Sequence, residues 1–185
     1  SVEINVGNDF EIDAGINITS LGGDGDKGGS DGADNTITIN GDSSINTFTV
    51  NNNSTLSGSI ISFYGMVEDD VFNIDETIAV TDATNSEILD GGDGDDIFKL
   101  TEERIFTVIK GGTGSDTIIA DTSNTRVNTW TISSLGLGTL VNDNNVNYTT
   151  DFTEIENITG NTKQDIINFT TNSSWLNGLI SGGDN

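Results

Sequence analysis

Histidine, cysteine and proline are absent from this sequence, and only 6 lysines and arginines stand against 30 aspartates and glutamates. Without cysteine the chain has no disulfide to stabilise it, and without histidine or cysteine it lacks the ligands that favour zinc. The shortage of basic residues argues against nucleic acid or an anionic membrane surface as a partner. No apolar run approaches the roughly 18 residues of a membrane span, so we expect no membrane insertion.

The acidic residues that remain give the 185-residue chain a formal net charge of -24. Such a charge repels itself and destabilises a compact state unless counter-ions neutralise it. Specific cation binding and simple solubility in salty surroundings both account for this acidity, and the charge alone does not choose between them. Isoleucine, valine, leucine and phenylalanine recur in short bursts, which favours many short strands over disorder.

Two copies of one short glycine-rich pattern lie in the middle of the chain, GGDGDDIF at 91–98 and GGTGSDTI at 111–118. Each copy has two glycines, a spacer, a third glycine, a spacer, an aspartate, a spacer and a large apolar residue. This is the GGxGxDxUx nonapeptide of calcium-binding parallel β-structures. Both copies resemble the RTX (repeats-in-toxin) family of secreted bacterial proteins, in which the ion lies between successive turns.

The resemblance implies a set of calcium ligands in these two turns. Asp96 and Asp116 would be the paired carboxylates, and Asp93 lies in the first loop. Carbonyl oxygens around the inner glycines would complete the shell of about six to eight oxygens that calcium takes; these glycines are Gly92, Gly94, Gly112 and Gly114. The alternative is a glycine–aspartate turn that is closed by its own side-chain hydrogen bonds without an ion.

Other turns carry the pattern in altered form. The loop at 22–34 has Lys27 where the motif aspartate belongs, yet it concentrates further acidic residues that we expect to hold calcium, namely Asp24, Asp26, Asp31 and Asp34. A flexible acidic loop is the alternative there. The turn at 65–70 loses its inner glycines but keeps Asp70, which we include among the metal ligands. The turns ending at Asn46 and Asp165 are expected to hold no ion or a weak one.

An Asp or Asn followed two residues later by a large apolar residue recurs along the chain, which predicts stacked coils. We expect an all-β fold, a parallel β-solenoid (β-roll or β-helix) of roughly seven irregular coils spanning 1–185. Because the last residues read as the start of another repeat, we expect a single segment of a longer repeat protein. The apolar residues should form one inner column, made of Phe48, Phe72, Phe98, Ile118, Trp130 and Ile167.

These features predict a calcium-binding structural or adhesive module of a secreted or cell-surface bacterial protein. Its partners would be calcium ions and a surface glycan, a surface protein or copies of itself. Catalysis is not expected, because no histidine is present and the lysines and arginines are scattered. Two alternatives stay open. One is a polysaccharide-active β-helix enzyme or its attached calcium module, and the other is an ice-binding solenoid with outward threonines such as Thr36, Thr38, Thr47 and Thr49.

Overall fold

The computed structural model describes residues 2–5, 7, 9–12, 17–19, 36–50, 55–58, 60–74, 79–80, 87–100, 108–120, 127–142 and 149–183. All regular secondary structure in these ranges is β-strand. Within them, no helix is long and apolar enough to cross a membrane. The loop at 22–34, with its predicted calcium ligands Asp24, Asp26, Asp31 and Asp34, lies outside the described residues.

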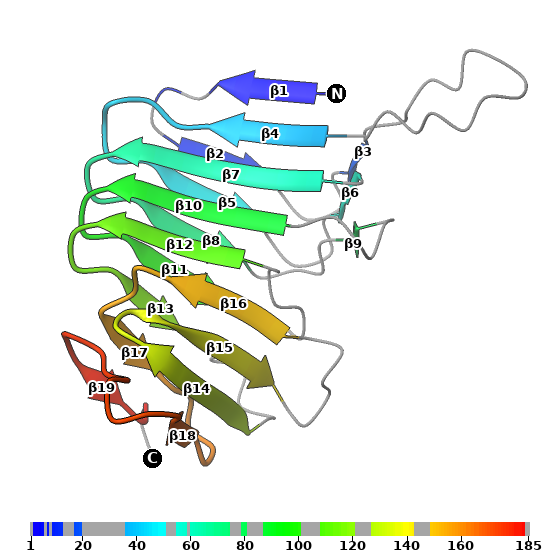
Figure 1. The fold of residues 1–185 in the computed structure, drawn as a ribbon. Coiled ribbons are helices and arrows are strands. Elements are labelled where there is room, and N and C mark those ends of the chain that lie inside the picture. The colour runs from blue at the N-terminus through cyan, green and yellow to red at the C-terminus, as the bar shows by residue number, and fades with distance from the viewer. Residues whose placement is uncertain are drawn as a thin grey trace, which may run out of the picture.

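The strands form two large sheets and one small one (Figure 1). The first sheet has the order β1 (Val2–Asn5), β4 (Thr36–Asn40), β7 (Ile60–Val67), β10 (Glu87–Asp93), β12 (Val108–Thr113), β16 (Thr149–Thr153), β15 (Leu137–Asn142), β14 (Asn128–Ser134) and β18 (Ile166–Phe169). The second has the order β19 (Ile180–Ser181), β17 (Asn157–Thr159), β13 (Thr117–Ile119), β11 (Ile97–Leu100), β8 (Val71–Ile74), β5 (Thr47–Val50) and β2 (Asp9–Ile12). The third contains β3 (Asn17–Thr19), β6 (Thr55–Gly58) and β9 (Ala79–Val80).

The chain passes repeatedly from a strand of the first sheet, through a short bend, to a strand of the second sheet. We call each such unit a tier; examples are β7 with β8, β10 with β11, β12 with β13 and β16 with β17. Successive tiers pair in parallel, as in Leu89 with Phe63 and with Ile109. Figure 1 shows the bends stacked along one edge of the molecule. The predicted parallel stacking of strands is confirmed for these tiers.

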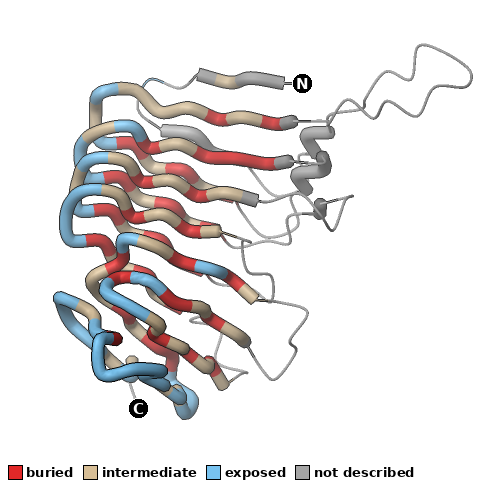
Figure 2. The backbone as a smooth tube through the Cα atoms, viewed as in Figure 1, coloured by how far each residue is buried: buried red, intermediate tan, exposed pale blue. Residues whose placement is uncertain are grey.

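The core lies between the two large sheets, because each tier turns alternate residues inward (Figure 2). Phe48, Phe72 and Phe98 occupy the same register position on β5, β8 and β11. Their rings stack with centroids 4.9 Å apart and planes at 10°. Offset stacking of this kind adds roughly 0.5–1.5 kcal/mol per pair to the burial of the rings. The predicted phenylalanine column is therefore confirmed.

The continuation of that column differs from the prediction. Ile118 follows Phe98 as expected, but the next member is Ile158 on β17. Trp130 and Ile167 pair with each other on β14 and β18, which belong to the first sheet. The prediction that they extend the column is wrong, because an apolar residue two positions after an Asp or Asn does not tell which sheet its strand joins.

An antiparallel hairpin causes this difference. Strands β14 and β15 pair antiparallel, β15 pairs antiparallel with β16, and β16 then returns to pair in parallel with β12. The segment between β13 and β16 is thus an insertion, and β17 resumes the second sheet directly beside β13. The hairpin places its own apolar residues in the core, where Trp130, Ile132 and Leu140 are buried.

Candidate metal centre

The bends at 65–70, 91–96 and 111–116 each have positive φ at the same two positions. The inner glycines of the two motif copies have positive φ, at Gly92 (102°), Gly94 (143°), Gly112 (109°) and Gly114 (147°). Glycine adopts these angles without the steric cost of a Cβ. The bend at 65–70 also has positive φ at these positions, with Met66 at 90°, close to the glycine values, and Glu68 at 71°. The motif therefore marks two bends of a series that extends to a third.

Each bend ends in an aspartate whose side chain points inward, and the three side chains follow one another along the stack of tiers. We call Asp70, Asp96 and Asp116 the carboxylate row; all three are fully buried. Asp70 N donates to Asp96 Oδ1 at 2.7 Å, and Asp96 N donates to Asp116 Oδ1 at 2.8 Å. At the ends of the row, Asn46 N donates to Asp70 Oδ1 at 2.6 Å and Asp116 N donates to Glu156 Oε2 at 3.0 Å. Each aspartate thus joins its own tier to the preceding one.

The second carboxylate oxygen of each member has no partner. Oδ2 of Asp70, Asp96 and Asp116 is buried and accepts no hydrogen bond. A buried polar atom in this state is costly, on the order of 1–3 kcal/mol and more for a charged group. Such atoms are rare in native proteins and indicate a missing ligand or a proton.

A backbone carbonyl from the next tier lies beside each orphaned oxygen. A Cβ added to Gly91 would overlap both Asp96 Oδ2 and the carbonyl oxygen of Gly111. The same holds for Gly65, which adjoins Asp70 Oδ2 and the Gly91 carbonyl, and for Gly111, which adjoins Asp116 Oδ2 and the Glu154 carbonyl. Each of these glycines thus lies against one unpartnered carboxylate oxygen and one backbone carbonyl oxygen, an approach that a Cβ would prevent.

Asn46 occupies the equivalent place in the bend at 41–46 and behaves differently. Its Oδ1 accepts from Asp42 N at 2.8 Å, and its Nδ2 donates to Asp42 Oδ1 at 3.2 Å. The neutral amide is therefore satisfied within its own bend. This bend has no positive φ at 42–45, unlike the other three, and its backbone N–H at Asp42 reaches the Asn46 side chain.

Burial shifts the titration of the row. Loss of hydration raises the pKa of Asp70 and of Asp96 to about 6, although the N–H bond that each accepts acts in the opposite direction. Burial likewise raises the pKa of Asp116 to about 7. Neighbouring carboxylates add to the rise, including Asp96 and Glu156 around Asp116. A cation bound beside the row would relieve both the burial and the repulsion.

The arrangement offers one carboxylate oxygen and one carbonyl oxygen at each of the three positions. Within the described ranges, no group of three or more Asp and Glu side chains is placed to hold a metal ion. An ion in the row would therefore combine single carboxylates with backbone carbonyls and water, a donor set that calcium accepts.

The other predicted ligands lie around this row. The carbonyls of Gly92 and Gly94 lie against Gly112 and Gly114 of the next bend. Asp93 is exposed and accepts a hydrogen bond from Thr113 Oγ1 at 2.8 Å. The structure thus brings Asp70, Asp96 and Asp116 together and leaves Asp93 on the surface.

The sequence analysis did not identify three of the carbonyl groups beside the row, nor the glutamate side chain that accepts a hydrogen bond from Asp116 N. Gly91 and Gly111 are the first motif glycines, so the motif itself could have identified their carbonyls. Glu154 and Glu156 lie beyond the hairpin, in a bend whose sequence carries no trace of the motif. The pairing of β16 with β12 and of β17 with β13 brings them to Asp116.

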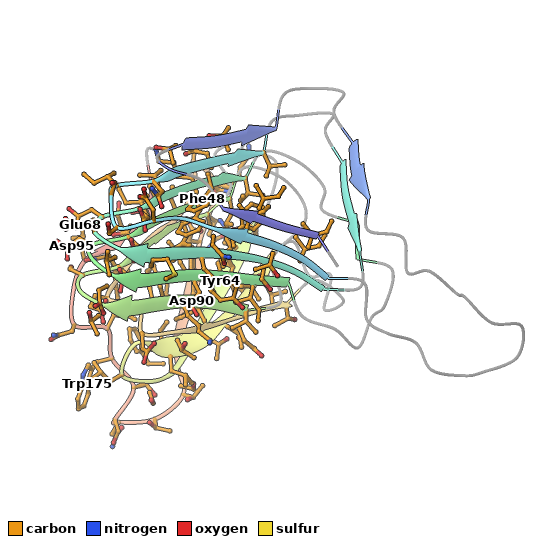
Figure 3. The ribbon with its side chains drawn as sticks, turned by 90° about the horizontal axis from the view of Figure 1, so that it is seen from above. Phe48, Tyr64, Glu68, Asp90, Asp95 and Trp175 are labelled. Atoms are coloured by element: carbon orange, nitrogen blue, oxygen red, sulfur yellow. The ribbon has the colours of Figure 1, made fainter. Side chains whose placement is uncertain are left out.

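A second, exposed ladder runs along the outside of the bends. Asp95 N donates to Asp69 Oδ1 and Ser115 N donates to Asp95 Oδ1, both at 2.8 Å. Figure 3 shows Glu68 and Asp95 at this edge of the molecule. Because these carboxylates are in contact with water, they serve as matched controls for the buried row.

Comparison with protein-family models, with curated proteins and with solved structures gave no match to this chain.

Proposed function

We propose that this chain is a calcium-binding structural or adhesive module of a secreted or cell-surface protein, built as an RTX-like parallel β-solenoid. The observation that carries the proposal is the carboxylate row, in which Asp70, Asp96 and Asp116 each bury an unpartnered oxygen beside a backbone carbonyl. The formal charge of -24 supports the same conclusion, because bound cations would reduce the self-repulsion of the folded state.

The solenoid interpretation follows from the succession of tiers. Each tier contributes one strand to each large sheet and pairs in register with the tiers on either side. Repetition of this kind builds a rod in which every tier contacts only its neighbours. The hairpin of β14 and β15 is then a local insertion into the rod.

Calcium fits the donors better than other common ions. All the available donors are oxygens, whereas zinc favours nitrogen and sulfur. Magnesium demands a nearly ideal octahedron and keeps its waters, whereas calcium accepts flexible sets of carboxylates and carbonyls. The ligands would be Asp70 Oδ2 with the Gly91 carbonyl, Asp96 Oδ2 with the Gly111 carbonyl, and Asp116 Oδ2 with the Glu154 carbonyl.

Each of these pairs joins one tier to the next, so bound calcium would stabilise the stack itself. Extracellular calcium modules bind at about 10⁻⁴–10⁻³ M. The sites would therefore fill outside the cell and stay empty in the cytoplasm. Because the ion binds the folded form alone, its binding free energy adds to the stability of the fold. The role we propose is structural, and any adhesive target would contact the outer surfaces of the sheets.

Calcium titration of three proteins tests the proposal. Calorimetry and circular dichroism at pH 7.5 should show calcium binding and a rise in melting temperature for the wild type. Asp96→Asn should lose a site, because the amide keeps the acceptor for Asp70 N–H but removes the anionic oxygen. Asp95→Asn removes one exposed charge from the same bend and should bind like the wild type. Wild-type protein without calcium binding, or equal losses in both variants, would contradict the proposal.

A further inference from the structure

A second unsatisfied carboxylate lies apart from the row, where β18 meets β14. These two strands pair in parallel with Thr129 opposite Ile166. Asn128 and Asp165 directly precede this pair, so they occupy neighbouring positions on the two strands. Strand β18 is the last strand of the first sheet and lies beside β14 of the hairpin (Figure 1). None of the residues of the carboxylate row takes part in it.

One hydrogen bond joins the two side chains, and one oxygen atom on each side chain remains without a hydrogen-bond donor. Asn128 is fully buried, and its Nδ2 donates to Asp165 Oδ1 at 2.9 Å. Asn128 Oδ1 and Asp165 Oδ2 are both buried without a partner. Gly160 lies against the carboxylate, and a Cβ there would overlap it. The site therefore holds two orphaned oxygens on side chains that already contact each other.

A single proton satisfies both atoms at once. A carboxylic acid and a primary amide are complementary, since each has one donor and one acceptor side by side. We propose that Asp165 is protonated on Oδ2 and donates to Asn128 Oδ1, so that the two side chains form an acid–amide pair that fastens β18 to β14. The existing bond from Asn128 Nδ2 is the other half of this pair.

The surroundings of Asp165 favour the neutral acid. Burial raises its pKa, and the hydrogen bonds from Asn128, from the Trp130 side chain and from the Asn161 backbone lower it less. None of these groups is charged. Lys163 is the nearest cationic residue along the chain, and its side chain is exposed. Its backbone N–H donates to Asn161 Oδ1 at 2.7 Å.

A metal ion suits this site less well than a proton. The pair supplies two oxygens and one charge, far short of the roughly six to eight oxygens of a calcium shell. Ionisation of Asp165 would leave a buried charge facing an amide oxygen. The hydrogen-bonded contact between β18 and β14 is therefore sensitive to pH, and it weakens when Asp165 loses its proton.

Hydrogen exchange at β18 tests this inference in the full chain, in chelator so that calcium plays no part. Protection of the β18 amides, corrected for intrinsic exchange, should fall as the pH rises from 5 to 7.5. The part of the fall due to Asp165 is about tenfold for each unit by which its folded pKa exceeds 5, the lowest pH measured. Asp165→Asn should lose less protection than the wild type over this range, because two amides form the same paired bonds without a proton and only the loss due to the carboxylate row remains. Asp151→Asn, an exposed change on β16, should behave as the wild type.

Several results would overturn the inference. One is wild-type protection that does not change with pH, and another is an Asp165→Asn variant that loses as much protection as the wild type. A third is protection at neutral pH that calcium restores in the wild type and not in Asp165→Asn, since a cation would then hold the pair. These outcomes are independent of calcium binding to Asp96, so the proposed function is tested separately.

Discussion

The sign of the pH dependence of stability should reverse when calcium is added. In chelator, Asp70, Asp96 and Asp116 have folded-state pKa values of about 6, 6 and 7 against an ordinary value of 3.8. The folded state then binds protons more tightly than the unfolded state. The contribution of the row is fully present below about pH 4 and is lost as the pH rises through about 6 to 7.

The size of this loss follows from the pKa shifts. One pKa unit corresponds to about 1.36 kcal/mol, so the rise of Asp96 from 3.8 to about 6 corresponds to roughly 3 kcal/mol. The three members are coupled, and their combined effect is on the order of several kcal/mol. Domains are stable by about 5–15 kcal/mol in total. The calcium-free protein should therefore be markedly less stable at pH 8 than at pH 5.

Calcium changes this relation because its ligands must be deprotonated. At a concentration 100-fold above its dissociation constant, an ion adds about 2.7 kcal/mol per site. Protons compete with the ion at low pH, so this gain is largest at high pH. With saturating calcium, stability should rise between pH 5 and pH 8.

Urea unfolding followed by circular dichroism measures both curves, in chelator and in calcium, at pH 5, 6, 7 and 8. Asp96→Asn should be more stable than the wild type at pH 8 in chelator, because the neutral amide removes a buried charge and can donate to the Gly111 carbonyl. Asp95→Asn should follow the wild type. Curves of the same sign with and without calcium would refute the reasoning, as would an Asp96→Asn variant that keeps the full wild-type dependence.

Three further substitutions test the bends and the core. Met66→Gly should stabilise the protein by about 1 kcal/mol in thermal unfolding, because it relieves the strain of a backbone φ of 90° at a residue whose side chain is exposed. The control Val67→Gly relieves no positive φ and should destabilise the protein. Gly91→Ala should remove the Asp96 site in calorimetry, because its Cβ overlaps Asp96 Oδ2, while Gly182→Ala has open space and should bind like the wild type. Phe72→Ala should lower the free energy of unfolding by about 3–5 kcal/mol in urea titration, and a loss below 1 kcal/mol would contradict the stacked column.

Local sequence patterns predicted much of this molecule. Glycine spacing predicted the bends at 91–96 and 111–116, because positive φ is a local property of glycine. The phenylalanines at 48, 72 and 98 predicted the core column, because strands of similar tiers stack in register. The bend at 65–70 was less visible, since Met66 and Glu68 take glycine-like angles that their identities disfavour.

Non-local pairing accounts for what the sequence did not predict. The hairpin of β14 and β15 displaces Trp130 to the first sheet, and no local signal distinguishes an insertion from another tier. The same insertion separates Asp116 from Glu156 by 40 residues, yet the pairing of β12 with β16 brings them together. Asn128 and Asp165 likewise meet only because β18 pairs with β14.

Anomalous diffraction from calcium-grown crystals tests the central claim most directly. Our account predicts a peak between Asp96 Oδ2 and the Gly111 carbonyl, with both oxygens about 2.3–2.6 Å from the ion. Weaker or equal peaks should lie beside Asp70 and Asp116. A row without anomalous density in saturating calcium, with each Asp Oδ2 hydrogen bonded directly to its facing carbonyl, would contradict the account.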